Sequence, residues 1–291
     1  MELNITLGFE NVPIVHSNFE RISFMSKWDQ EVLNLRTQGF EVYGAKDLIL
    51  TQQHDIPSFF LSIAKGIINA QTLDDSYKNA LQLEGIECNT NRFWPIFASI
   101  LNRCIHLSFI TGQHGNWVSP QKWRLMVSLN DPNNQVNRIY IFYPPANLFD
   151  KEMSKQCIPI PQTFIDFVTI SNGLGIGALE NQYICGIGPS RGDWEIVTRH
   201  IPVYSSLYQE LVIETLCWNN SYDSDFEVGN ITNSKYKSLI PFAYTFDSWC
   251  YNRFFTDVAG EFSVYLWDHE QTKPVREEKS FYEWVLQTLQ R

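Results

Sequence analysis

From residue 239 the chain reads Leu-Ile-Pro-Phe-Ala-Tyr-Thr-Phe-Asp-Ser-Trp-Cys-Tyr-Asn-Arg-Phe-Phe-Thr-Asp, and from residue 260 it reads Gly-Glu-Phe-Ser-Val-Tyr-Leu-Trp-Asp-His-Glu. Both runs are rich in aromatic and β-branched residues, which favour strands. The sequence Lys-Ser-Phe-Tyr-Glu-Trp-Val-Leu-Gln-Thr-Leu then begins at residue 279. Ser280 followed by Glu283 is the pattern of a capping box, and the apolar residues after it recur at helical spacing. We therefore expect two strand-like segments followed by an amphipathic helix whose packed face holds Phe281, Trp284, Val285 and Leu289.

A second helix is predicted upstream, beginning near Pro161 and ending at Asn172-Gly173, because glycine adopts a left-handed conformation after a helix at no steric cost. Its expected buried stripe is Phe164, Ile165, Phe167, Val168 and Ile170. Short strand-like runs follow at 183–188 and 194–197, then a helix-like run at 203–218 and a polar loop at 219–237.

In this order, the C-terminal segments resemble the SUKH superfamily, whose SMI/KNR-like domains include bacterial immunity proteins and fungal cell-wall regulators. The resemblance covers residues 158–290 and departs from the family at residues 245–249, where a Gly-Asp-rich turn is usual. It implies an α+β fold with a twisted, mostly antiparallel sheet and packed helices, and a protein that acts by binding proteins. The resemblance is carried by Pro161, Phe164, Phe167, Asn172-Gly173, Ile240-Pro241-Phe242-Ala243, Asp247, Gly260, Val264-Tyr265, Trp267-Asp268-His269 and Ser280-Phe281.

The first half of the chain resembles no family that we can name, but its pattern is helix-rich. Periodic apolar residues predict helices from Ser17 to near Gly39, over 57–70 and over 73–83, and 93–109 is a fourth apolar-periodic stretch. Residues 3–15 alternate loosely and could form a strand. The runs 123–129 and 138–143 flank an Asn/Asp/Pro turn, which predicts a β-hairpin. The polar segment 146–158 follows a double proline, so we expect a helix-rich N-terminal region over 1–150 and a SUKH-like domain over 151–291.

Composition excludes several classes of function. The 291 residues are 44% hydrophobic and carry a net charge of −10, which predicts a folded chain and disfavours binding to nucleic acid or an anionic membrane. Residues 151–291 hold 18 acidic and 11 basic side chains, against 14 and 11 in residues 1–150. An acidic surface instead suits a basic protein partner.

The six cysteines lie at least 16 residues apart, so no Cys-x-x-Cys pair exists for zinc or redox chemistry. We expect reduced thiols in a cytoplasmic protein. The first residues lack the basic start and apolar core of a signal peptide, and no apolar run is long enough to span a bilayer.

Three motifs invite a chemical interpretation, and each has a simpler one. The glycines at 173–177 and 186–192 do not open a helix, as a phosphate loop requires. The carboxylates of Asp223, Asp225 and Glu227 alternate as in a calcium loop, but that loop's sixth and twelfth positions hold Val228 and Ser234. The sequence Trp267-Asp-His-Glu270 is expected to be a strand end entering a turn. We therefore predict no catalytic residue, metal or cofactor.

The leading hypothesis is a non-enzymatic immunity protein that neutralises a cognate toxin by binding a basic toxin domain. Its candidate partner-binding residues are Asp223, Asp225, Glu227, Trp249 and Tyr251. Two alternatives stay open. One is an intracellular regulatory scaffold of the cell-wall-regulator type, and the other is an enzyme with an N-terminal activity, which a polar pocket near His106 or His114 would favour.

Overall fold

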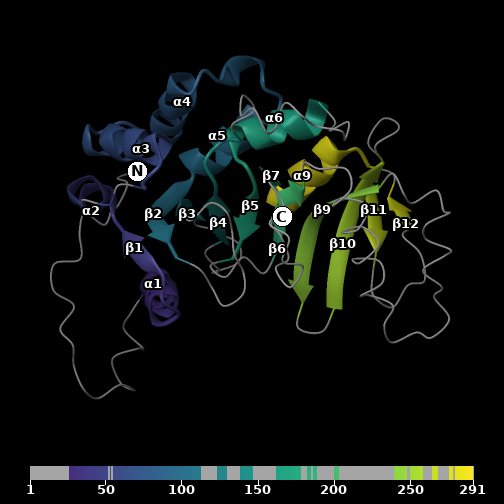
Figure 1. Cartoon of the computed structure of the whole chain (residues 1–291), viewed down its shortest axis with the longest axis horizontal. Coiled ribbons are helices and arrows are strands. Elements are labelled where there is room, and N and C mark those ends of the chain that lie inside the picture. Colours follow the sequence, from purple (N-terminus) through teal and green to yellow (C-terminus); the bar gives the residue numbers. More distant parts are fainter. Residues whose placement is uncertain are drawn as a thin grey trace. The chain divides into compact units, whose positions relative to one another are not determined.

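The computed structural model describes fourteen ranges of the chain, and its ribbon is shown in Figure 1. The chain divides into two compact units, residues 1–144 with 175–180 and residues 145–174 with 181–291. Each unit combines helices with a mostly antiparallel sheet, so the predicted α+β class is confirmed. The described residues are 26–51, 53, 55–112, 123–129, 138–146, 162–177, 182–184, 186–188, 200–202, 239–247, 250–257, 264–267, 275–277 and 279–290.

The first unit places a sheet between two layers of helices. Its strands lie in the order β1-β2-β3-β4-β5, and the three pairings from β1 to β4 are antiparallel. The pairing of β3 with β4 confirms the predicted hairpin. The helices are α1 (Lys27–Thr37), α2 (Ala45–Leu50), α3 (Ser58–Ile68), α4 (Leu73–Leu83) and α5 (Trp94–Asn102), and the strands are β1 (Glu41–Tyr43), β2 (Cys104–Thr111), β3 (Trp123–Leu129), β4 (Arg138–Phe142) and β5 (Leu174–Ile176).

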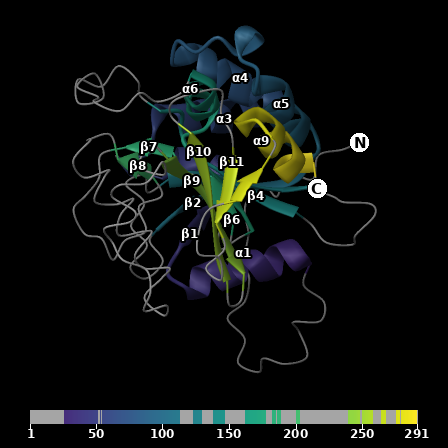
Figure 2. The ribbon, with the colours of Figure 1, turned by 90° about the vertical axis from the view of Figure 1, so that its right-hand side faces the viewer.

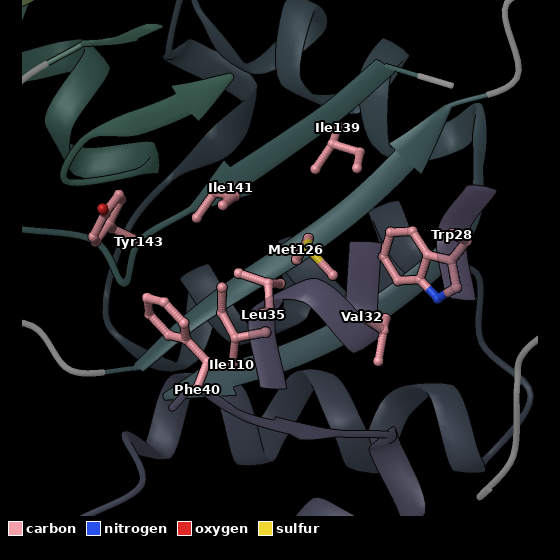
Figure 3. Packing of buried hydrophobic residues seen from close by; sticks show 9 residues of the cluster. All are labelled: Trp28, Val32, Leu35, Phe40, Ile110, Met126, Ile139, Ile141 and Tyr143. Atoms are coloured by element: carbon pink, nitrogen blue, oxygen red, sulfur yellow. The ribbon is translucent and has the colours of Figure 1, made fainter. Parts of the chain in front are cut away.

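Helices cover both faces of this sheet. Figure 2 shows α1 on one side of the strands and α4 and α5 on the other. On the α1 side, Figure 3 shows α1 and the strands contributing to one apolar cluster, whose members are Trp28, Val32, Leu35, Phe40, Ile110, Met126, Ile139, Ile141 and Tyr143. On the other side, Phe109 meets Phe60 of α3, and Phe142 meets Tyr77 of α4 and Phe97 of α5. Every residue of β3 is consequently buried, as expected for a strand covered on both faces.

Two helix predictions in this unit need correction. The helix expected from Ser17 does not run through Ser26, which has extended backbone and caps α1 by accepting a hydrogen bond from the Asp29 amide. The sequence favoured Ser17 as the N-cap because Glu20 follows it by three residues, and Ser26 and Asp29 have the same spacing. Ser17 lies outside the described residues. The apolar-periodic stretch 93–109 is a helix only to Asn102, and β2 begins at Cys104.

The second unit holds an antiparallel sheet in the order β6-β9-β10-β11-β12, with a separate parallel pair, β7 and β8. The run 239–257 is two paired strands rather than one, and their register shifts where Pro241 of β9 faces Phe255. Proline cannot donate to a ladder, so an irregularity at this point accommodates it. The elements are α6 (Gln162–Ile170), β6 (Gln182–Ile184), β7 (Gly186–Gly188), β8 (His200–Pro202), β9 (Leu239–Asp247), β10 (Cys250–Asp257), β11 (Val264–Trp267), β12 (Val275–Glu277) and α9 (Phe281–Gln290).

The helices predicted near Pro161 and after Ser280 are present as α6 and α9. In α6, Ile165 is half-buried, whereas the other four residues of the expected stripe are buried. Gly173 has a φ of +116°, in the region that favours glycine. The predicted run 194–197, the helix-like run 203–218 and the loop 219–237 lie outside the described residues, as does the segment 3–15. Within the described ranges, no helix combines the length and the apolar character needed to cross a bilayer.

Candidate functional site

The predicted partner-binding residues fall mostly outside the described part of the chain. Asp223, Asp225, Glu227 and Trp249 lie in ranges 203–238 and 248–249, which the structure does not describe. Tyr251 is in β10, where its Cα pairs with that of Phe246 in β9. The five residues therefore stay predictions.

Four of the residues that carry the SUKH resemblance pack against one another and against Trp284. Phe281, the first residue of α9, has its ring 5.4 Å from Phe164 and 5.7 Å from Phe167 of α6, and 5.1 Å from Phe242 of β9. Trp284 of α9 packs edge-on against Phe242 at 5.2 Å. All five side chains are at least 95% buried. We call these five residues the aromatic cluster; it joins one strand and two helices of the second unit.

A capping box formed by Ser280 and Glu283 begins α9, directly before Phe281 of this cluster. The Glu283 amide donates to Ser280 Oγ at 3.2 Å, and the Ser280 amide donates to Glu283 Oε2 at 2.8 Å. These two bonds satisfy backbone donors that a helix start leaves unpaired. The hydrogen bonds from Ser280 also lower the pKa of the Glu283 carboxyl, because they favour its charged form.

A polar group that sequence reasoning missed lies at the edge of the first unit's sheet. The Tyr43 hydroxyl donates to the Glu41 carboxylate, and Gln53 Nε2 donates to both Glu41 Oε2 and the Tyr43 oxygen at 2.9 Å. The Tyr43 ring also contacts that of Trp123, 5.5 Å away. Burial raises the pKa of Tyr43 to about 12, with further contributions from Glu41, while the bonds from Tyr43 and Gln53 lower the pKa of Glu41. β1 has only three residues, so the sequence gives no periodic pattern from which this polar group could be predicted.

His106, the residue named for the enzyme hypothesis, is packed against α1. Its ring stacks on Trp28 at 5.3 Å and 18°, and burial lowers its pKa, opposed in part by Asp29. Ser128 faces it on the neighbouring strand and is fully buried. His106 Nδ1 and Ser128 Oγ are not hydrogen-bonded to each other, so they do not form a linked base and nucleophile. His114 lies outside the described residues.

The described thiols are unsuited to nucleophilic or metal chemistry at neutral pH. Burial raises the pKa of Cys88 to about 11 and that of Cys104 to about 12, so both remain protonated. Among the described residues there is no group of three His, Cys, Asp or Glu side chains placed to hold a metal ion.

The described glycines of the two glycine-rich segments lie at strands or turns, not at a helix start. Gly175 is in β5, and Gly186 and Gly188 are in β7. A Cβ at Gly186 would lie 2.3 Å from the backbone oxygen of Asn172, so this glycine permits a close approach of two backbone segments. This packing role explains Gly186 without a bound phosphate.

Comparisons with protein-family models, curated proteins and solved structures found no match for this chain.

Proposed function

We propose that the chain is a non-enzymatic binding protein, of the immunity type, that neutralises a toxin by occupying a basic surface of it. The observation that carries this proposal is the aromatic cluster. Five residues at the positions on which the SUKH resemblance rests, or in the helix that follows them, meet in one core although they span residues 164 to 284. Such convergence supports a shared fold over chance similarity of separate motifs, and the resemblance implies protein binding.

The charge of the chain supports a basic partner. The net charge is −10, and the second half carries most of the excess. An acidic protein attracts a basic partner during diffusional encounter, and the attraction weakens with added salt. We place the docking residues at Asp223, Asp225 and Glu227, with Trp249 and Tyr251 as aromatic anchors, since aromatic side chains contribute disproportionately to interface affinity.

We further propose that the protein acts in the cytoplasm. Cys88 and Cys104 are buried free thiols, which is usual in a reducing compartment.

The docking residues can be tested by charge neutralisation against a matched control. The test variant carries Asp223→Asn, Asp225→Asn and Glu227→Gln, and the control carries Glu31→Gln, Asp47→Asn and Glu87→Gln in the first unit. Both lose three negative charges. Once the partner is in hand, its Kd is measured by calorimetry at several salt concentrations.

The test variant should bind more weakly and show a flatter dependence of Kd on salt, while the control keeps the wild-type slope. Equal slopes for wild type and test variant would remove these three residues from the interface. Equal weakening in both variants would show that only net charge matters, which would also exclude a specific docking site there.

A further inference from the structure

The three-residue strand β1 (Glu41–Tyr43) is an edge strand among the described strands of the first unit. In the strand order of the first unit β1 stands at one end, and its residues pair with β2 in the register Glu41 with Thr111, Val42 with Ile110 and Tyr43 with Phe109. Among the described residues, no strand pairs with its other side (Figure 1). An unpaired edge of this kind is a template on which another strand can add.

The carbonyl of Val42 on this edge is occupied by a side chain. Arg36, in the last turn of α1, donates from Nη2 to the Val42 oxygen at 3.3 Å. In an antiparallel ladder, alternate residues direct both their N–H and C=O to the same side. Because the Val42 carbonyl accepts from Arg36, a residue outside the ladder, we infer that Val42 directs its carbonyl and its amide away from β2.

The side chains of β1 are also suited to antiparallel pairing with a second copy of β1. If two copies of β1 paired antiparallel about Val42, each Glu41 would face Tyr43 of the other copy. Glu41 and Tyr43 are a compatible donor and acceptor, because they already form a hydrogen bond within the chain. Directly opposed residues in such a pair have Cβ atoms about 5 Å apart, within reach of these side chains.

We propose that the outer edge of β1 is a pairing surface for β1 of a second copy of this chain, and that Arg36 inhibits this pairing by its hydrogen bond to Val42. The Arg36 guanidinium donates to the Val42 carbonyl oxygen. In the pair, this oxygen would instead accept from the Val42 amide of the other copy. Natural sheets protect their edges with charged side chains and short edge strands in the same way. This device is independent of the proposed docking residues, which lie in the second unit.

The test uses the full chain and measures mass by sedimentation equilibrium over a wide range of protein concentration. Arg36→Met keeps the aliphatic stem and removes the donors, whereas Arg36→Lys keeps a cationic donor as a matched control. A double variant adds Val42→Pro to Arg36→Met, because proline lacks the amide that the pair would exchange. Where Arg36→Met shifts the thermal unfolding midpoint, Arg36→Leu, which also lacks a donor, replaces it.

Arg36→Met should lower the Kd of self-association by about tenfold or more, since a charged donor forms one of the stronger hydrogen bonds to a carbonyl. Arg36→Lys and the double variant should both behave as wild type. The proposal is overturned if Arg36→Met has the wild-type mass at every concentration. It is equally overturned if the double variant keeps the added association, because the contact would then lie away from β1.

Discussion

Phe281 is the residue whose removal should most damage the second unit. Its side chain is 1% exposed and its ring lies within 5.7 Å of the rings of Phe164, Phe167 and Phe242. Replacing a core phenylalanine by alanine costs about 3–5 kcal/mol, from lost burial and the cavity left behind. Edge and tilted ring pairs add about 0.5–1.5 kcal/mol each beyond burial. With three such pairs, we expect Phe281→Ala to lie near the upper end, at about 4–5 kcal/mol.

Two variants calibrate this value. Phe281→Leu keeps most of the apolar volume and loses the three ring contacts, so it should cost at least about 1.5 kcal/mol, and less than Phe281→Ala. Gln287→Ala changes an exposed position of the same helix and should stay within about 0.5 kcal/mol of wild type.

The free energies are measured by urea unfolding followed by circular dichroism. Because the chain has two compact units, unfolding can show two transitions, and hydrogen exchange then assigns the shifted one to its unit. The loss should appear in the transition that exposes the amides of α6 and α9. A loss below about 1 kcal/mol for Phe281→Ala, or a loss confined to the first unit, would refute the claim that these motif residues form the core of the second unit.

Three further perturbations test other parts of the structure. Ser280→Ala removes the capping hydroxyl of α9 and should cost about 1 kcal/mol in urea unfolding, while Ser280→Asp should retain most of the stability; equal losses would argue against the capping box. Gly186→Ala should cost at least about 1–3 kcal/mol, because its Cβ would meet backbone atoms of Asn172 that cannot rotate away; an unchanged thermal midpoint would contradict this close approach. Burial lowers the pKa of His106 below its ordinary 6.5, so the stability it contributes is complete above pH 6.5 and is lost as the pH falls through that value toward the folded-state pKa. His106→Gln should flatten unfolding free energy against pH in that window, and an unaltered profile would mean that His106 does not titrate differently on folding.

The strongly patterned segments were predictable, and two of them, α6 and α9, lie in the part of the chain that carries the resemblance. The helix at 73–83 has the predicted bounds, and Ser280 with Glu283 forms the expected capping box. These segments carry a complete local signal: a cap, a regular apolar period and a terminating residue. The hairpin of β3 and β4 was equally clear, because two β-favouring runs flank a turn.

The errors arose where two local signals were equivalent. Ser26 and Ser17 both offer an N-cap, and only the backbone at Ser26 shows that α1 begins there. The stretch 93–109 contains the helix α5 and the strand β2, and both are rich in apolar residues. Periodicity alone does not distinguish a short buried helix from a buried strand. The strand β1 has three residues and the helix α2 has six, which is too short for a period to appear.

The polar group at the β1 edge could not be found from sequence for a different reason. Glu41 and Gln53 are 12 residues apart, and nothing local relates them. Their contact depends on β1 adding to β2 and on the path of the chain from α2 to α3. Contacts that depend on tertiary arrangement in this way need a structure.

Protection from a toxin is the most direct test of the proposed function. The tagged chain is used to isolate partners from its native host, and each stoichiometric basic partner is expressed in a sensitive host with and without this chain. We predict that one such partner is toxic alone and that co-expression of the wild-type chain restores growth. Growth restored equally by an unrelated acidic protein, or a stoichiometric partner that is not toxic, would contradict the immunity proposal.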